Sequence, residues 1–278
     1  MIPSQLSLAS LQPASKVKTF SLVSGSSGNS IFIGHQSTKL LIDCGVSAKR
    51  LTAALRVHDE DPEELTAILI THEHSDHIAG LSVLARRHRI PVYMPEPTWN
   101  ILKHKLNFAE RLDVRFIEPG QYLSIGDSSI HVFETSHDAV CPVGYRVDTG
   151  RAVIGVATDT GELTPRHASV LGGADLLYIE ANYDPDMLYD GPYPWPLKQR
   201  IDSVRGHLSN QQSAAAIGDL VRKGSTRFVL AHLSQENNMP DLAYSSVSGD
   251  LHLAGFKEGV DLKLQVAPRH EPSPVFEL

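Results

Sequence analysis

Short apolar runs rich in β-branched residues recur between polar turns along most of the chain, and this pattern predicts strands. They cover residues 17–23, 30–34, 38–43, 65–70, 129–135, 143–147, 151–158, 175–180, 227–232 and 261–267. Apolar residues at helical spacing predict helices over residues 47–57, 77–88, 97–106, 197–204, 209–222 and 240–254. Ser209 and Gln212 have the spacing of a capping box at the start of the fifth helix. Strands in runs, with helices between and after them, indicate an α/β protein of stacked sheets flanked by helices.

The length of 278 residues and the 41% of apolar residues are enough for one large domain. Residues 1–16 contain Ser and Pro without a clear period, so we expect an N-terminal extension there and a single domain over residues 17–278. No apolar run approaches the ~20 residues of a membrane span, and the start of the chain lacks the basic residues of a signal peptide. The two cysteines form no disulfide framework, which favours a reducing compartment. We therefore expect a cytoplasmic protein without membrane contacts.

The formal net charge of −7 is informative about possible partners. A protein that coats duplex nucleic acid without sequence preference presents a strongly basic surface, and this composition argues against one. Any recognition of phosphate must therefore be local.

The sequence THEHSDH at residues 71–77 is dense in candidate metal ligands. It places His72, His74, Asp76 and His77 within six consecutive positions. Composition alone would produce this pattern in roughly two of a thousand such chains. A fortuitous surface cluster is therefore a poor explanation.

The residues on either side of this motif place it at a strand-to-helix turn. An apolar strand pattern precedes it at residues 65–70, and helical spacing follows it at residues 78–88. In extended backbone, the first two histidines point to one side while Glu73 turns away. The aspartate and the last histidine then enter the first helical turn, where the chain has changed direction. Two ligand pairs aimed at neighbouring points predict a two-metal site, because one ion with four closely spaced protein ligands would be structural and closed.

Three later strands each lead to another candidate ligand: His137 follows residues 129–135, Asp159 follows residues 151–158, and His232 ends residues 227–232. Alone, each has an ordinary explanation, since an isolated histidine is usually just polar and an aspartate after a strand usually forms a turn. Their recurrence at strand ends favours a shared site. One ion would then take His72, His74 and His137, the other Asp76, His77 and His232, and Asp159 would bridge the two.

The order of these residues resembles that of the metallo-β-lactamase-fold hydrolases. The resemblance implies a four-layer αββα sandwich of two mixed β-sheets flanked by helices. Asp43, in the segment LLIDCG, is similar to the family's early aspartate, which supports the metal-binding loop from behind the ligands. By sequence alone, this residue is equally well explained as a turn-forming aspartate before Gly45.

Several segments outside the ligands resemble the YycJ/WalJ-type members of that family, which are metal-dependent 5′-to-3′ DNA exonucleases. They are SGSSGNS (24–30), TSHDA (135–139), residues 180–201, GHLSN (206–210) and AHLSQENN (231–238). The resemblance extends from about Val17 to about Ala267. It departs from the family at Tyr183, where His is usual, and a phenol with an ordinary pKa near 10 is a poor proton shuttle at neutral pH.

The resemblance implies a binuclear metal-dependent phosphodiester hydrolase in which a hydroxide between two ions attacks phosphorus. Catalytic roles fall to Asp76 and to His207, which would protonate the leaving oxygen or clamp the phosphate. His207 is also explicable as a neighbour of the Ser209 helix cap. Candidate substrate contacts are Ser26, Ser27, Gly28, Asn29, Asn182, Lys198, Arg200, Ser209 and Asn210. The first four lie in a Gly-rich loop that is equally compatible with a plain hairpin turn.

Imidazole and carboxylate ligands suit two divalent metal ions, with Zn²⁺ the default and Mn²⁺ or Fe²⁺ compatible. DNA is the favoured substrate. A small-molecule or cyclic-nucleotide phosphodiesterase of the same fold is the first alternative, favoured by the acidic charge. A non-catalytic metal-binding sensor module is the second. The complete ligand set and the additional His207 argue against a sensor, because a sensor needs no additional proton donor beside an open metal site.

Overall fold

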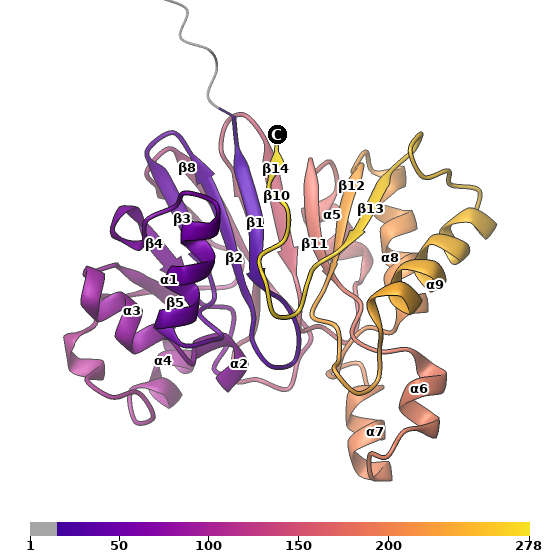
Figure 1. Ribbon diagram of the computed structural model, residues 1–278, viewed down its shortest axis with the longest axis horizontal. Helices are drawn as coiled ribbons and strands as arrows, with labels where there is room; N and C mark the ends of the chain where they lie inside the picture. Colours follow the sequence, from indigo (N-terminus) through magenta and orange to yellow (C-terminus); the bar gives the residue numbers. More distant parts are fainter. Residues whose placement is uncertain (1–15) are drawn as a thin grey trace, which may run out of the picture.

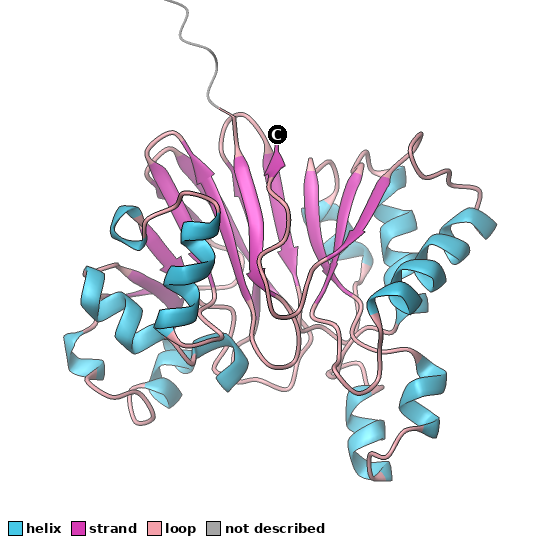
Figure 2. Ribbon diagram, in the orientation of Figure 1, coloured by secondary structure: helices cyan, strands magenta, loops and turns pink. Residues whose placement is uncertain are grey.

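The computed structural model describes residues 16–278, so the predicted extension over residues 1–16 falls almost entirely outside the described residues. Two seven-stranded mixed sheets stack face to face within this range, and helices cover their outer faces (Figure 2). This arrangement confirms the αββα sandwich expected from the sequence.

The first sheet has the strand order β14-β1-β2-β3-β4-β5-β6. Its strands are β1 (Lys18–Val23), β2 (Ser30–His35), β3 (Thr38–Ile42), β4 (Ala67–Leu69), β5 (Val92–Pro95), β6 (Val114–Ile117) and β14 (Phe276–Glu277). Strands β3 to β6 run parallel to one another. Their carboxyl ends therefore lie at the same edge of the sheet.

The second sheet has the order β13-β12-β11-β10-β9-β8-β7. Its strands are β7 (Tyr122–Ile125), β8 (Ser128–Glu134), β9 (Val143–Asp148), β10 (Val153–Ala157), β11 (Leu176–Glu180), β12 (Arg227–Ala231) and β13 (Lys263–Val266). Strands β10 to β13 are parallel, so the chain leaves β10, β11 and β12 at one shared edge.

All ten predicted strands are present, and sequence reasoning missed β5, β6, β7 and β14. The reason differs between them. β5 lies between Pro91 and Pro95, and prolines normally argue against a strand. β6 and β7 are partly exposed edge strands with little alternation, and β14 has only two residues.

Helices α1 (Ala48–Val57), α3 (Leu81–His88) and α4 (Glu96–Leu102) pack on the first sheet, and α5 (Pro165–Leu171), α8 (Asn210–Arg222) and α9 (Pro240–Leu253) pack on the second (Figure 1). The predicted helix over residues 77–88 is divided into α2 (Ser75–Ile78) and α3, with Gly80 between them. A Cβ at Gly80 would lie 2.2 Å from the Val46 carbonyl oxygen, so only glycine allows this close approach. The Ser209–Gln212 capping box is confirmed, because each side chain bonds the other residue's backbone N–H.

Two further helices, α6 (Pro185–Asp190) and α7 (Trp195–Ile201), project beyond the end of the sheets (Figure 1). α7 begins and ends a few residues before the predicted helix over 197–204, and α5 and α6 were not predicted. Short 3₁₀ turns occur at Pro62–Glu64 and Ala109–Arg111.

A continuous apolar layer lies between the two sheets and fixes their relative position. Its buried members include Ile33, Tyr145 and Tyr178. The Tyr145 hydroxyl donates to the Ile70 carbonyl at 2.6 Å, so this phenol is satisfied inside the core and also ties the second sheet to the chain just before the metal-binding motif. The strand ends at this edge are therefore held by a packed core rather than by loops alone.

Candidate metal centre

Three of the residues that follow strands at the shared edge have left-handed backbone conformations. Asp43 follows β3 with φ of 62°, Asp159 follows β10 with φ of 56°, and His232 follows β12 with φ of 57°. This conformation is uncommon for residues with a Cβ, and costs of order 1–3 kcal/mol each. Backbone strain gathered in this way is typical of functional sites, since the surrounding core must hold it in place.

The motif at residues 71–77 forms the turn between β4 and α2. His72 and His74 lie in the turn with ring centroids 4.5 Å apart, and His77 lies in α2. Glu73 points the other way, where its Oε1 accepts a hydrogen bond from the Val140 N–H at 2.8 Å. The alternation expected for extended backbone is therefore present.

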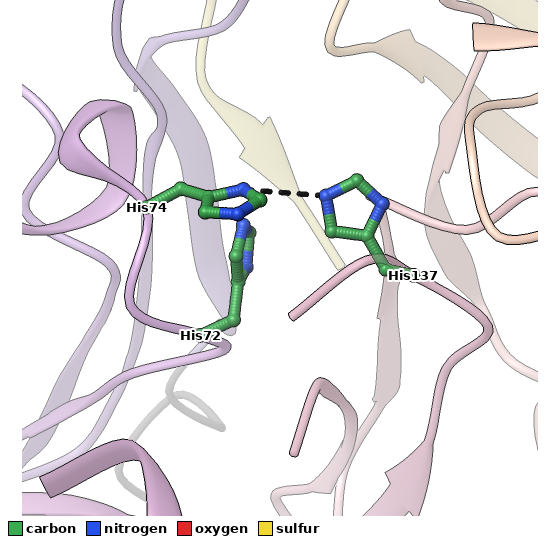
Figure 3. Close-up of side chains that lie close together, drawn as sticks. All are labelled: His72, His74 and His137. Atoms are coloured by element: carbon green, nitrogen blue, oxygen red, sulfur yellow. Dashed lines mark hydrogen bonds between the residues drawn. The ribbon is translucent and has the colours of Figure 1, made fainter. Parts of the chain in front are cut away.

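A first group of possible ligands comprises His72, His74 and His137, with ligand atoms within 4.8 Å of one another (Figure 3). His137 Nε2 lies 3.3 Å from His74 Nδ1. The other ring nitrogen of His137 donates to the Gly206 carbonyl at 3.0 Å, which leaves Nε2 facing the group. His137 thus comes from the second sheet to meet two histidines from the first.

A second group comprises Asp76, His77 and His232. Asp159 lies between the two groups. Its carboxylate oxygens are 3.7 Å from His137 Nε2 and 3.3 Å from His77 Nε2. The structure therefore brings together the seven side chains that the sequence singled out, with Asp159 between the two groups.

The ring nitrogens of the motif are oriented by hydrogen bonds behind them. Asp43 accepts from His77 Nδ1 at 2.8 Å and from the Thr71 hydroxyl at 2.8 Å. The Thr71 hydroxyl in turn lies 3.0 Å from His72 Nδ1. Both histidines consequently turn Nε2 toward the site, which is the supporting arrangement expected around a metal ligand.

Several buried ligand atoms in this site have no hydrogen-bond partner among residues 16–278. They are His72 Nε2, His232 Nε2 and Asp159 Oδ2. Leaving such atoms unpaired costs about 1–3 kcal/mol each. Divalent cations would satisfy all of them at once, so the residues fit bound metal ions.

The electrostatics of the second group favour positive charge. Burial lowers the pKa of His232, but Asp159, Asp76 and Glu180 outweigh it and raise the pKa to about 10. Burial likewise lowers the pKa of His77, and Asp159, Asp43 and Asp76 raise it well above its ordinary value. Carboxylates that stabilise a proton here would also stabilise a cation, which replaces that proton when the metal binds.

Glu180, at the end of β11, is a buried member of the site that sequence reasoning missed. Its Oε1 accepts from His207 Nδ1 and from His232 Nδ1, each at 2.7 Å, and its Oε2 accepts from the Thr160 N–H at 2.8 Å. Burial raises the pKa of Glu180, but the two histidines outweigh it and hold the pKa below its usual range. The signal was available, since Glu180 ends an apolar strand as the other site residues do.

His207 lies at the wall of a cavity of about 220 Å³ that opens onto the metal-ligand groups. Its ring centroid is 4.9 Å from that of His137 and 5.2 Å from that of His232. The side chain is 19% exposed, compared with 3% for His232. With Nδ1 bonded to Glu180, His207 has Nε2 left for a ligand in the cavity.

Among the predicted substrate contacts, Ser26, Asn182 and Arg200 line this cavity. Arg200 is paired there with Asp138. Asn182 donates to the His232 carbonyl at 2.8 Å, so it also supports the backbone of a ligand residue.

The other predicted contacts do not line the cavity, and the side chains of Lys198, Ser209 and Asn210 have partners elsewhere in the fold. Lys198 is buried, and its ammonium donates to the Tyr189 and Gly191 carbonyls at 2.6 and 2.8 Å. A cation satisfied by backbone oxygens near the end of α6 supports that turn rather than a phosphate. Ser209 caps α8, and the Asn210 amide is paired with Asn238.

The Gly-rich loop at residues 24–30 forms the hairpin turn between the antiparallel strands β1 and β2. Gly28 N–H donates to the Gly25 carbonyl at 2.9 Å, and neither Ser27 nor Gly28 lines the cavity. Asn29 supports the metal-binding motif instead, since its backbone N–H donates to the Asp76 carbonyl at 2.8 Å and its side-chain amide lies 3.1 Å from His77 Nε2.

Tyr183 is a structural residue in this geometry. Its hydroxyl donates to Asp202 at 2.5 Å, at the end of α7. Burial and the neighbouring Asp202 carboxylate both raise the pKa of Tyr183 above its ordinary value. A phenol with a raised pKa remains protonated at neutral pH and is a poor proton shuttle there.

Comparisons with known proteins show the family and the fold of this chain. Residues 38–233 match the family described as the beta-lactamase superfamily domain, and this range contains all seven candidate ligands. The metallo-beta-lactamase fold protein YhfI from Bacillus subtilis superposes with a TM-score of 0.72 at 18% identity, covering 95% of this chain and all of YhfI. The chain belongs to the metallo-β-lactamase superfamily.

Within the superfamily, the chain is similar to two proteins named as exodeoxyribonucleases. It is 40% identical over 259 residues to exodeoxyribonuclease WalJ of Streptococcus pneumoniae, covering 92% of this chain and 96% of WalJ. It is also 40% identical over 239 residues to exodeoxyribonuclease YycJ of Bacillus anthracis, covering 86% of this chain and 90% of YycJ. The YycJ/WalJ resemblance inferred from the sequence is confirmed. Among the helices that the structure describes, none combines the length and apolarity needed to cross a bilayer.

Proposed function

We propose that this protein is a binuclear metal-dependent exodeoxyribonuclease that degrades DNA from 5′ ends. The observation that carries the proposal is the pair of adjoining ligand groups around Asp159, with buried ligand atoms that lack partners. The similarity to WalJ and YycJ supports DNA as the substrate. The departure at Tyr183 does not weaken it, because that phenol lies outside the ligand groups.

In this proposal, His72, His74 and His137 hold one divalent ion, Asp76, His77 and His232 hold the other, and Asp159 is shared. When bound, two such ions make water nucleophilic at neutral pH and neutralise charge on the phosphate oxygens. Zn²⁺ suits this nitrogen and oxygen ligand set, and Mn²⁺ and Fe²⁺ are also compatible with it.

Other residues of the chain act directly on the substrate. His207 holds a proton at Nε2 for the leaving oxygen, while Glu180 fixes the orientation of its ring through Nδ1. Arg200 and Ser26 lie at the cavity wall, where they can contact non-bridging phosphate oxygens. The cavity of about 220 Å³ is smaller than those that enclose drug-sized ligands, which favours a strand end over a continuous duplex.

Metal content is the first test. We expect two divalent ions per purified chain, and loss of bis(p-nitrophenyl) phosphate hydrolysis after chelation, because the nucleophile depends on the bound ions. Elemental analysis with parallel rate measurements checks both statements. One tightly held ion with full activity would disprove the binuclear proposal, and two bound ions without hydrolysis of any phosphodiester would favour the sensor module.

Substrate topology is the second test. We expect 5′-phosphorylated linear DNA to be shortened progressively from its 5′ ends, and closed circular DNA to resist, because closed circular DNA offers no strand end to the proposed site. End-labelled fragments resolved on denaturing gels distinguish end removal from internal cutting. Circular DNA degraded as fast as linear DNA would contradict the proposal, and faster hydrolysis of cyclic nucleotides would favour the small-molecule alternative.

A further inference from the structure

The α6–α7 segment, residues 185–201, projects beyond the end of the sheets (Figure 1). Two large aromatic side chains are exposed on it. Trp195 is 59% exposed and Tyr189 is 41% exposed. The chain has only two tryptophans, and the other, Trp99 in α4, packs against the core. Tryptophan is highly buried on average, so this exposed tryptophan, with Tyr189 next to it, is a candidate contact for a ligand.

The two aromatic rings contact each other on the same segment that supplies part of the cavity wall. Their centroids are 5.8 Å apart and their planes are tilted by 44°. Tyr193, Leu197 and Arg200, from the same segment, line the cavity that contains His207. α7 therefore forms part of the wall of the site and also carries Trp195, while Tyr189 of the pair lies on α6.

Hydrogen bonds fix this segment to the rest of the fold. Asp202, directly after α7, accepts from the hydroxyls of both Tyr183 and Tyr189. Tyr183 follows β11 and is almost fully buried, so it anchors α7 to the sheet that supplies Glu180. Lys198 closes the turn after α6 from inside, through the carbonyls of Tyr189 and Gly191. The aromatic pair is thus presented by an anchored element, with little ordering entropy left to lose on binding.

The charge around the pair indicates which part of a nucleic acid it contacts. Asp186 and Asp190 are exposed on α6, and the whole chain has a net charge of −7. Phosphates are unfavourable beside these acids, whereas Arg200 provides positive charge at the cavity wall. Nucleobases stack on aromatic rings without requiring positive charge, and every base has a face to offer.

We propose that Trp195, together with Tyr189, forms a stacking platform for unpaired nucleobases of the strand whose end occupies the cavity. The ligand is a single-stranded segment of DNA, held by its bases at α6–α7 and by its phosphate near Arg200. This inference rests on the proposed nuclease function and adds the element that recognises the nucleotides beside the scissile bond. Stacking of this kind makes binding tolerant of sequence.

The test compares Trp195→Ala and Trp195→Phe with the unchanged protein. Binding of a phosphorothioate oligonucleotide with an unpaired 5′ end is measured by fluorescence anisotropy, and a 2-aminopurine in that end reports stacking. Trp195→Ala should weaken binding by about 5- to 150-fold and abolish the 2-aminopurine quenching, since it removes the platform. Trp195→Phe keeps an aromatic face and should stay within about threefold of the unchanged protein. Hydrolysis of bis(p-nitrophenyl) phosphate, which has no nucleobase, should change by less than about twofold in both variants.

Phe116→Ala is the matched control, because this phenyl ring is 51% exposed on β6, at the outer edge of the other sheet. It should leave oligonucleotide binding unchanged. Unaltered binding by Trp195→Ala would overturn the inference, as would an equal loss on both substrates without rescue by Trp195→Phe. If the unchanged protein binds the oligonucleotide through Trp195 but cleaves no DNA, the inference stands and the proposed function fails.

Discussion

His232→Ala is expected to abolish turnover and to weaken binding of the second metal ion, whereas His207→Ala should keep both ions and lose rate by about 10²- to 10⁴-fold. The two histidines lie in similar sequences, GHLSN and AHLSQ. Comparing the two variants therefore distinguishes a metal ligand from a residue that acts on the substrate. Metal content by elemental analysis and the rate of DNA shortening are measured for each variant.

The reason for this assignment is the position of each ring. His232 Nε2 is buried without a hydrogen-bond partner and lies 3.5 Å from Asp76 Oδ2, within the second ligand group. His207 lies outside that group, in another group of possible ligands with Asp159, Glu180 and His232, and its side chain is more exposed to the cavity than that of His232, at 19% compared with 3%. Removing a ligand leaves the ion incompletely coordinated, while removing an acid leaves coordination intact and raises only the barrier to departure of the leaving group.

His252→Ala, on the exposed face of α9, is the control for loss of an imidazole. It should change neither the metal content nor the rate of DNA shortening. Loss of a metal ion in His207→Ala, with both ions retained in His232→Ala, would exchange the two assignments. The strand-end argument would then have failed.

Glu180→Ala is expected to lower the free energy of unfolding by about 3–5 kcal/mol, because it leaves the buried His232 and the partly exposed His207 without their shared partner. Glu180→Gln keeps the shape of the side chain but removes its charge. We expect it to fold and to lose about 10- to 100-fold in metal affinity or rate, the usual effect of removing a residue that orients a ligand. Urea denaturation of the metal-free protein measures the first effect, and metal titration with rate measurements gives the second.

The geometry around Glu180 explains why the amide is a poor replacement. One carboxylate oxygen accepts from both histidines, and the other accepts from the Thr160 N–H. An amide offers only one oxygen, so a nitrogen donor must face either the imidazoles or the backbone N–H. Glu118→Gln, at an exposed position, is the control. Unchanged metal affinity and rate in Glu180→Gln would show that Glu180 does not position either histidine.

Local patterns in the sequence were enough to predict most of the framework. The strand-to-helix turn at residues 71–77 follows from an apolar run, a histidine-rich turn and helical spacing, all within about twenty residues. Asp159 and His232 were identified because each follows an apolar strand, and parallel strands deliver such residues to one edge. These features depend on neighbours in sequence, so periodicity and turn chemistry predict them.

The tertiary structure decided which of the remaining polar residues belong to the site. Lys198 and Arg200 are two positions apart on α7, yet one binds the carbonyls of its own segment and the other lines the cavity. Glu180 became important only when β11 was placed between β10 and β12, which brings two histidines to one carboxylate. Tyr183 anchors α7 through Asp202 rather than occupying a catalytic position. Each of these roles depends on contacts between residues that are not neighbours in the sequence. The local pattern of apolar and polar residues does not predict such contacts.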